Sequence, residues 1–103
     1  MVVEVKSFEE YTKLINGDKV VVVDWFATWC GPCKVISPVF AELSNEFTNV
    51  VFVKVDVDEV PEAAEGAGIR AMPTFQFYQA GKKVDEIVGA NPAKLKETIA
   101  KYN

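Results

Sequence analysis

The chain has 103 residues, half of them hydrophobic, which suits one small domain over 1–103 and is too short for two cores. The 11 basic residues are outnumbered by 15 acidic ones, so the net charge is −4 and no basic surface is expected to bind nucleic acid. Histidine is absent, which excludes histidine-based hydrolases and removes the commonest metal ligand.

In the first half of the chain, hydrophobic residues recur with a period of two in some segments and of 3.6 in others, which are the periods of strands and helices. Ser7 and Glu10 form a capping-box pattern that predicts where the first helix begins. Pro38 lies inside the second predicted helix and should kink it, because its ring displaces a backbone hydrogen bond. The elements expected here are a strand over 2–5, a helix from Phe8 that stops at Gly17, a buried strand over Val20–Phe26, and a helix that follows Cys33 with Ile36, Val39, Phe40, Leu43 and Phe47 as its apolar face.

In the second half, Gly81 marks a hairpin turn, and Asn91 followed by Pro92 marks the start of a final helix. The elements expected here are a strand over Val50–Val55, a short helix around Glu59–Ala67, a strand that begins at Phe75, its hairpin partner over Val84–Val88, and the helix after Asn91. The order β-α-β-α-β-α-β-β-α predicts an α/β fold with a central mixed sheet and helices on both faces.

Cys30 and Cys33 enclose Gly31-Pro32 at the expected junction between a buried strand and a helix. Cysteines at this spacing lie about one helical turn apart and can form a small disulfide that reopens. Free amide groups and the dipole at a helix N-terminus lower the pKa of a thiol, and the thiolate is the attacking species in disulfide exchange. We expect Cys30 to be the exposed nucleophile and Cys33, held in the first turn, to be the resolving thiol.

Other readings of the cysteine pair find less support. A zinc site needs four ligands, and the chain has no further cysteine or histidine, so no metal is expected. A dimer could supply four thiolates for an iron–sulfur cluster, but nothing in the sequence favours it. An inert core pair stays possible, although Gly31 and Pro32 shape a turn and contribute no packing.

Asp24 and Lys54 each interrupt an apolar strand pattern. A carboxylate at Asp24 would be buried, and desolvation would raise its pKa towards neutrality, so that it could take or deliver the proton of the resolving cysteine. The alternative is an aspartate that bonds local backbone at the end of the strand. Lys54 could pair with Asp24, or it could be an outward-facing lysine on an alternating strand.

These residues resemble the thioredoxin family. The segment Val21–Lys34, which contains the run W-C-G-P-C, resembles the active-site segment of that family. Ala71–Phe75 and Val88–Ala90 resemble its two flanking loops, and the likeness extends over the whole chain. A bare C-x-x-C would be weak evidence, but W-C-G-P-C with a later M-P-T and V-G-A is specific.

The resemblance implies a thioredoxin-like fold and a general protein-disulfide reductase. Such a protein needs no bound cofactor, and thioredoxin reductase recharges it at the expense of NADPH. By the same likeness, Asp24 is a buried proton carrier, Lys54 tunes that carboxylate, and Met72–Pro73 is a cis peptide bond beside the cysteines.

The resemblance also implies an apolar surface around the disulfide that docks extended segments of disulfide-containing proteins. Trp29, next to the nucleophile, could shield it and anchor a partner. For the valines and Met72 of this surface, ordinary core packing is the alternative. Its expected members are Trp29, Gly31, Pro32, Val57, Met72, Pro73, Val88, Gly89 and Ala90.

Location, assembly and a rival function complete these expectations. Residues 1–10 lack the pattern of a signal peptide, and the longest aliphatic run, Val20–Val23, is too short to span a membrane. The two cysteines lie closer together than the disulfide-forming cysteines of secreted domains. We therefore expect a cytoplasmic protein. We expect a monomer, with weak dimerisation through the apolar surface left open. The rival is a thioredoxin-like binding module that holds a partner without redox turnover.

An acid-rich stretch of five residues is interpreted as a solvated face, with steering of a basic surface on the reductase as the alternative. Its members are Asp56, Asp58, Glu59, Glu62 and Glu65.

Overall fold

The computed structural model describes all 103 residues, in five strands and four helices. The elements are β1 (Val2–Val5), α1 (Phe8–Ile15), β2 (Val21–Phe26), α2 (Gly31–Glu46), β3 (Val51–Asp56), α3 (Pro61–Ala67), β4 (Thr74–Gln79), β5 (Lys82–Val88) and α4 (Pro92–Tyr102). Their order is the predicted one, and the α/β class is confirmed.

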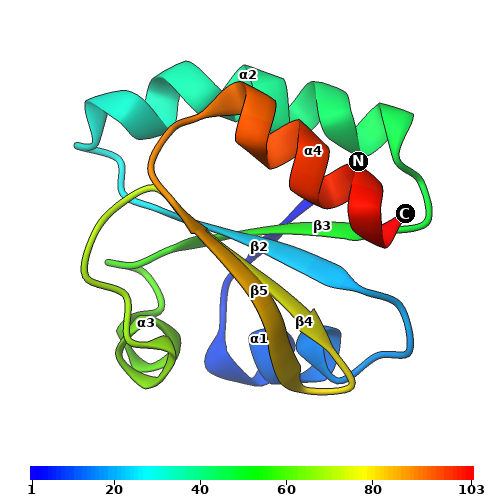
Figure 1. The fold of residues 1–103 in the computed structure, drawn as a ribbon. Helices are drawn as coiled ribbons and strands as arrows, with labels where there is room; N and C mark the ends of the chain where they lie inside the picture. The colour runs from blue at the N-terminus through cyan, green and yellow to red at the C-terminus, as the bar shows by residue number, and fades with distance from the viewer.

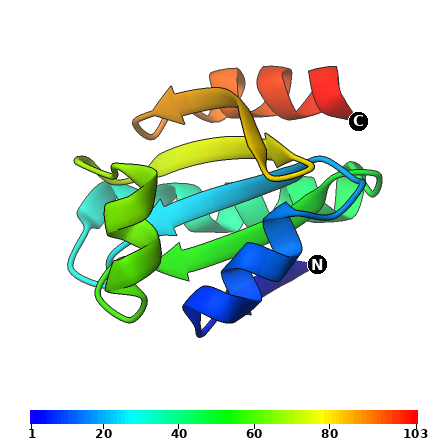
Figure 2. The ribbon, with the colours of Figure 1, turned by 90° about the horizontal axis from the view of Figure 1, so that it is seen from below.

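The strands form one mixed sheet in the order β1-β3-β2-β4-β5. β1 and β2 each pair with β3 in parallel, while β4 runs antiparallel to both β2 and β5. Helices α2 and α4 cover one face of the sheet, and α1 and α3 cover the other (Figures 1 and 2). Strand β2 therefore lies at the centre of a three-layer structure, buried on both sides.

Alternation along β2 divides the core into two apolar clusters. Val21, Val23 and Trp25 pack in the cluster on the α1–α3 face, whereas Val20 and Val22 pack in the cluster on the α2–α4 face. This parity directs Asp24, the next residue of the second set, towards α2. Burial on both faces explains why the sequence of β2 reads as a nearly continuous apolar run.

Element ends differ from the predicted ones by a few residues, for local reasons. Helix α1 ends at Ile15, two residues before the expected stop, and α3 begins only at Pro61. Strand β5 begins at Lys82, because Ala80 and Gly81, at φ values of 52° and 81°, form a two-residue turn that pairs the strands at once. Helix α2 continues through Pro38, and the kink expected there stays a prediction.

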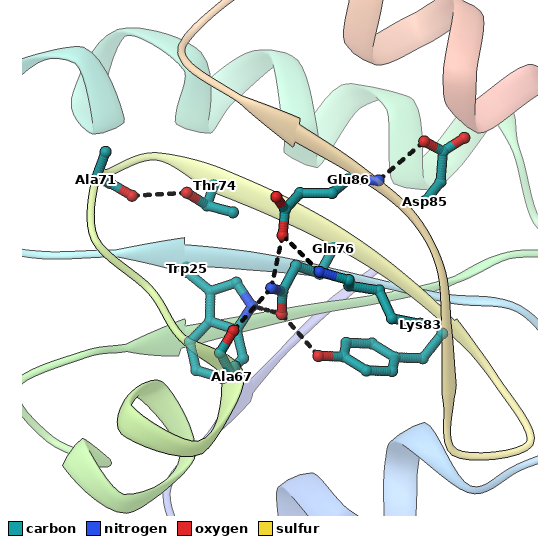
Figure 3. A network of polar contacts seen from close by, with 9 residues as sticks. Trp25, Ala67, Ala71, Thr74, Gln76, Lys83, Asp85 and Glu86 are labelled. Carbon is teal, nitrogen blue, oxygen red and sulfur yellow. Dashed lines mark hydrogen bonds and ion pairs between the residues drawn. The ribbon is translucent and has the colours of Figure 1, made fainter.

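A buried glutamine joins four elements (Figure 3). The side-chain oxygen of Gln76 accepts hydrogen bonds from Trp25 Nε1 (3.0 Å) and from the Tyr78 hydroxyl (2.7 Å). Its amide nitrogen donates to the Ala67 carbonyl (3.2 Å), at the end of α3, and to Glu86 Oε1 (2.9 Å) on β5. The residue is 1% exposed, so each of these bonds satisfies a group that has little access to water.

We predict that Gln76→Leu, which keeps the side-chain size, lowers the free energy of unfolding by about 2–4 kcal/mol, because the buried donors of Trp25 and Tyr78 lose their acceptor. Urea unfolding followed by fluorescence measures the change. The control is Gln79→Leu on the same strand, where the side chain is exposed and an effect within about 0.5 kcal/mol is expected. Equal destabilisation by the two changes would contradict the importance of the buried network.

Candidate active site

The two cysteines form a disulfide where β2 gives way to α2. Cys30 is the N-cap of α2, with extended backbone angles (φ −87°, ψ 112°), and Pro32 occupies the first turn, where a missing N–H costs nothing. The Cα atoms of Cys30 and Cys33 are 5.3 Å apart. The site thus lies at the carboxyl end of a central strand, where open α/β sheets place their functional groups.

The helix N-terminus supplies hydrogen-bond donors to Cys30. The backbone N–H of Cys33 donates to Cys30 Sγ (3.2 Å), and the N–H of Lys34 donates to the Cys30 carbonyl (3.4 Å). The first bond and the helix dipole would both stabilise a thiolate at Cys30 once the disulfide is reduced. The groups that begin the helix are thus placed to stabilise a negative charge on this sulfur.

The expectation that Cys30 is exposed is wrong for the disulfide form. Cys30 is 6% exposed and Cys33 is 5% exposed, so burial does not distinguish the two residues. Both pack with Ala27 in a small cluster, against the partly buried Val57 and Met72. The packing comes from loops that are far apart in the sequence, which local pattern does not predict.

Asp24 is buried, 4% exposed, and its Oδ1 has no hydrogen-bond partner. No backbone group donates a hydrogen bond to this oxygen. The alternative interpretation, an aspartate whose side chain bonds local backbone, is therefore not supported for Oδ1. Asp24 and Cys33 line the same cavity of about 210 Å³, together with Lys34 and Lys54. Desolvation raises the pKa of Asp24 from 3.8 to about 7, and the charge of Lys54 opposes part of that rise. The carboxyl can therefore exchange a proton near neutral pH inside a cavity that reaches the second cysteine.

Lys54 faces the same side of the sheet as Asp24, because the two are register partners on neighbouring parallel strands. Its ammonium group makes its ion pair with Glu4 (3.7 Å) and lies 5.5 Å from the centroid of the Phe26 ring. The pairing with Asp24 suggested by the sequence is thus replaced by an electrostatic influence across the cavity. Glu4 was not among the residues predicted for the site.

The loop before β4 approaches the disulfide with a cis peptide bond at Met72–Pro73, as the resemblance implied. Cys30 Sγ lies 3.6 Å from the Met72 carbonyl oxygen. The N–H of Gly89 donates to the Pro73 carbonyl (2.9 Å), which joins the two flanking loops. Met72 takes part in none of the backbone–backbone hydrogen bonds of the turns and loops, and its carbonyl is in contact with Cys30 Sγ alone.

The expected docking surface is mixed in its exposure. Trp29 and Val88 are strongly exposed, at 68% and 60%. Pro73 is buried, so it packs beneath the loop and does not form part of the exposed surface. Gly31, Pro32 and Ala90 are exposed, and Val57, Met72 and Gly89 are partly buried.

One further residue at this surface was missed by sequence reasoning. Asp58 accepts a hydrogen bond from Trp29 Nε1 (2.9 Å) and holds the indole in place.

The acid-rich stretch is not uniformly solvated. Asp58, Glu59, Glu62 and Glu65 are exposed, but Asp56 is only 6% exposed, and its Oδ1 accepts from the N–H of Asp58 (2.9 Å). Asp56 therefore shapes the loop that holds Asp58. No group of three or more cysteine, aspartate or glutamate side chains is placed to hold a metal ion. None of the helices combines the length and apolar character needed to cross a bilayer.

Comparison with known proteins agrees with this geometry. The family model described as thioredoxin matches residues 2–101. The chain is 52% identical to thioredoxin-1 of Schizosaccharomyces pombe over 99 residues, 96% of each chain, and 50% identical to the thioredoxin of Equus caballus over 101 residues, again 96% of each chain. The crystal structure of the Malassezia sympodialis thioredoxin superposes with a TM-score of 0.95 at 48% identity, covering 98% of this chain and 92% of that one.

The raised pKa of Asp24 predicts a pH-dependent penalty on stability. Below about pH 4 the carboxyl is neutral in both states; between pH 4 and 7 the unfolded chain loses the proton first, so the folded state loses relative stability as pH rises. Asp24→Asn should therefore gain about 4 kcal/mol over wild type between pH 4 and pH 8. Urea unfolding of the oxidised proteins measures this difference, with exposed Asp18→Asn as the control. Parallel pH profiles for wild type and Asp24→Asn would contradict the prediction.

Proposed function

The chain belongs to the thioredoxin family and carries out dithiol–disulfide exchange, and on this premise we propose how its residues divide the reaction. In this proposal Cys30 is the nucleophile, Cys33 is the resolving thiol and Asp24 is the proton acceptor. The observation that supports it best is the shared cavity, which joins Cys33 to the buried Asp24 and does not include Cys30. The family carries no bound cofactor, so the cysteine pair itself holds the two electrons.

In the first step the Cys30 thiolate attacks one sulfur of a substrate disulfide. A bond forms between Cys30 Sγ and that sulfur, the substrate disulfide breaks, and the second substrate sulfur leaves as a thiolate that takes a proton from water. The N–H of Cys33, now 3.2 Å from Cys30 Sγ, favours the thiolate that begins this step.

In the second step Cys33 resolves the mixed disulfide. Its thiol gives a proton to the Asp24 carboxylate, the thiolate attacks Cys30 Sγ, and the substrate leaves as its second thiolate. The protein ends oxidised, with the Cys30–Cys33 disulfide of the structure, and the substrate has gained two electrons. A cavity of about 210 Å³ has room for water, which can return the proton of Asp24 to solvent.

Docking of the substrate would use both the exposed apolar groups and the backbone of Met72. The N–H and C=O of Met72, which take part in no backbone–backbone hydrogen bond, can pair with an extended segment beside the disulfide, in the manner of an added strand. Trp29, fixed by Asp58, is suited to anchor an apolar side chain of that segment. The remaining expected contacts are Gly31, Pro32, Val57, Val88, Gly89 and Ala90, with Pro73 as the support of the loop.

Thioredoxin reductase, with electrons from NADPH, is the partner we propose for the return to the dithiol form. The disulfide-containing substrates are proteins, as the family implies. We further propose that residues 1–103 act as one cytoplasmic domain and as a monomer.

We predict that NADPH consumption with thioredoxin reductase and a disulfide-bonded protein ceases in Cys30→Ser, because the attacking thiolate is gone. Cys33→Ser should instead accumulate a mixed disulfide with the substrate, detectable by mass on a non-reducing gel, because the resolving thiol is missing. If wild type fails to turn over even with a chemical reductant, the reductase function is wrong and the binding-module alternative gains support. Trapping by Cys30→Ser in place of Cys33→Ser would reverse the assigned roles.

For the docking surface, we predict that Trp29→Ala raises KM for a protein disulfide about tenfold with a smaller change in kcat, since an exposed aromatic anchor is lost. A small aromatic disulfide, which does not reach across the surface, should be reduced at nearly the wild-type rate. Phe8→Ala, which removes another exposed aromatic, at the start of α1, is the matched control. An unchanged KM in Trp29→Ala would exclude the indole from the docking surface.

A further inference from the structure

Three side chains of alternating charge lie in one row across the sheet. Glu4 on β1 is the register partner of Lys54 on β3, and Lys54 is in turn the register partner of Asp24 on β2. Partners in neighbouring parallel strands point to the same face of a sheet, so the row places one ammonium group between two carboxyl groups. Lys54 can therefore turn towards Glu4 or towards Asp24.

The structure resolves that choice in favour of Glu4. Glu4 Oε1 lies 3.7 Å from Lys54 Nζ, whereas Asp24 has no ion pair and its Oδ1 has no hydrogen-bond partner. The ring of Phe26, 5.5 Å from Lys54 Nζ, adds a second attraction at the same position. The other oxygen of Glu4, Oε2, accepts from Lys6 Nζ (2.7 Å), which fixes the carboxylate that holds Lys54.

We propose that Glu4 is a positioning residue for the proton acceptor: by pairing with Lys54 it keeps that ammonium group off the Asp24 carboxyl, which thereby retains its affinity for a proton. The inference deepens the proposed function and rests on it for its catalytic meaning. Loss of Glu4 would free Lys54 to approach Asp24 and stabilise the carboxylate. The result would be an acceptor that ionises at lower pH and is a weaker base.

The other charged groups around the row come from α2, from β3 and from the loops that follow β1 and β3. Lys34 of α2 lines the cavity with Asp24 and Cys33. Asp56, the next residue of β3 on this face, has an oxygen engaged by the N–H of Asp58. Glu59, just before α3, reaches the row only through Lys6 (3.4 Å). Glu59→Gln therefore removes one negative charge from the same network without touching the Glu4–Lys54 pair.

The test is a pH titration of the Asp24 carboxyl in the oxidised protein, by NMR of ¹³C-labelled aspartate, with Asp24→Asn to assign the signal. The oxidised form keeps thiol ionisation out of the measurement. In Glu4→Gln the midpoint should fall by about half a pH unit, the scale of a partly exposed ion pair. It should stay at the wild-type value in Glu59→Gln and rise in Lys54→Gln, where the opposing charge is removed.

The double variant separates positioning from direct repulsion between the two carboxylates. If Glu4 acts through Lys54, the shift caused by Glu4→Gln should shrink in the Lys54→Gln background. A wild-type midpoint in Glu4→Gln, or an equal shift in both backgrounds, would overturn the proposal.

A kinetic profile tests the proposed function separately. The rate of the second step should rise with pH around the midpoint of the Asp24 titration. In Glu4→Gln this rise should occur at lower pH, and in Asp24→Asn it should be absent. A flat profile in wild type would remove Asp24 from the reaction while the titration still decides the role of Glu4.

Discussion

The structure depends on the burial of strand β2 on both of its faces. Because β2 is apolar in each direction, it needs helices above and below, and the remaining strands extend the sheet outward from it. Its carboxyl end is then a fixed point at one edge of the sheet, and α2 begins there with Cys30 as its N-cap. The reactive disulfide is thus held by the most deeply packed part of the fold.

The same burial makes Asp24 destabilise the folded state when it is ionised, and it also makes the carboxyl a stronger base. A carboxyl in the central strand, without a hydrogen-bond partner on Oδ1, has its pKa raised by desolvation to about 7. At an ordinary surface position this group would be ionised at neutral pH and would be a poor base. Functional sites commonly break one of the rules that the rest of a sequence obeys, and the apolar pattern of β2 is broken at this one residue.

Trp29 and Met72 illustrate how a catalytic surface is assembled from separate loops. The indole is exposed and could be assigned from its place beside Cys30, but Asp58, which holds it, follows another strand. The Met72 carbonyl lies 3.6 Å from Cys30 Sγ although 42 residues separate them. Such contacts bury Cys30 as deeply as Cys33, which the local pattern around the cysteines had not indicated.

The sequence by itself determined the order of elements, the α/β class, the disulfide chemistry of Cys30 and Cys33, and the burial of Asp24, because each is written in local periodicity or spacing. Tertiary structure alone decided which groups meet the reactive ones. The local sequence around Lys54 is the same whether its ammonium group pairs with Asp24 or with Glu4. Only the pairing of β1 with β3 brings Glu4 within reach. Strand register is a long-range property, so no local pattern contains it.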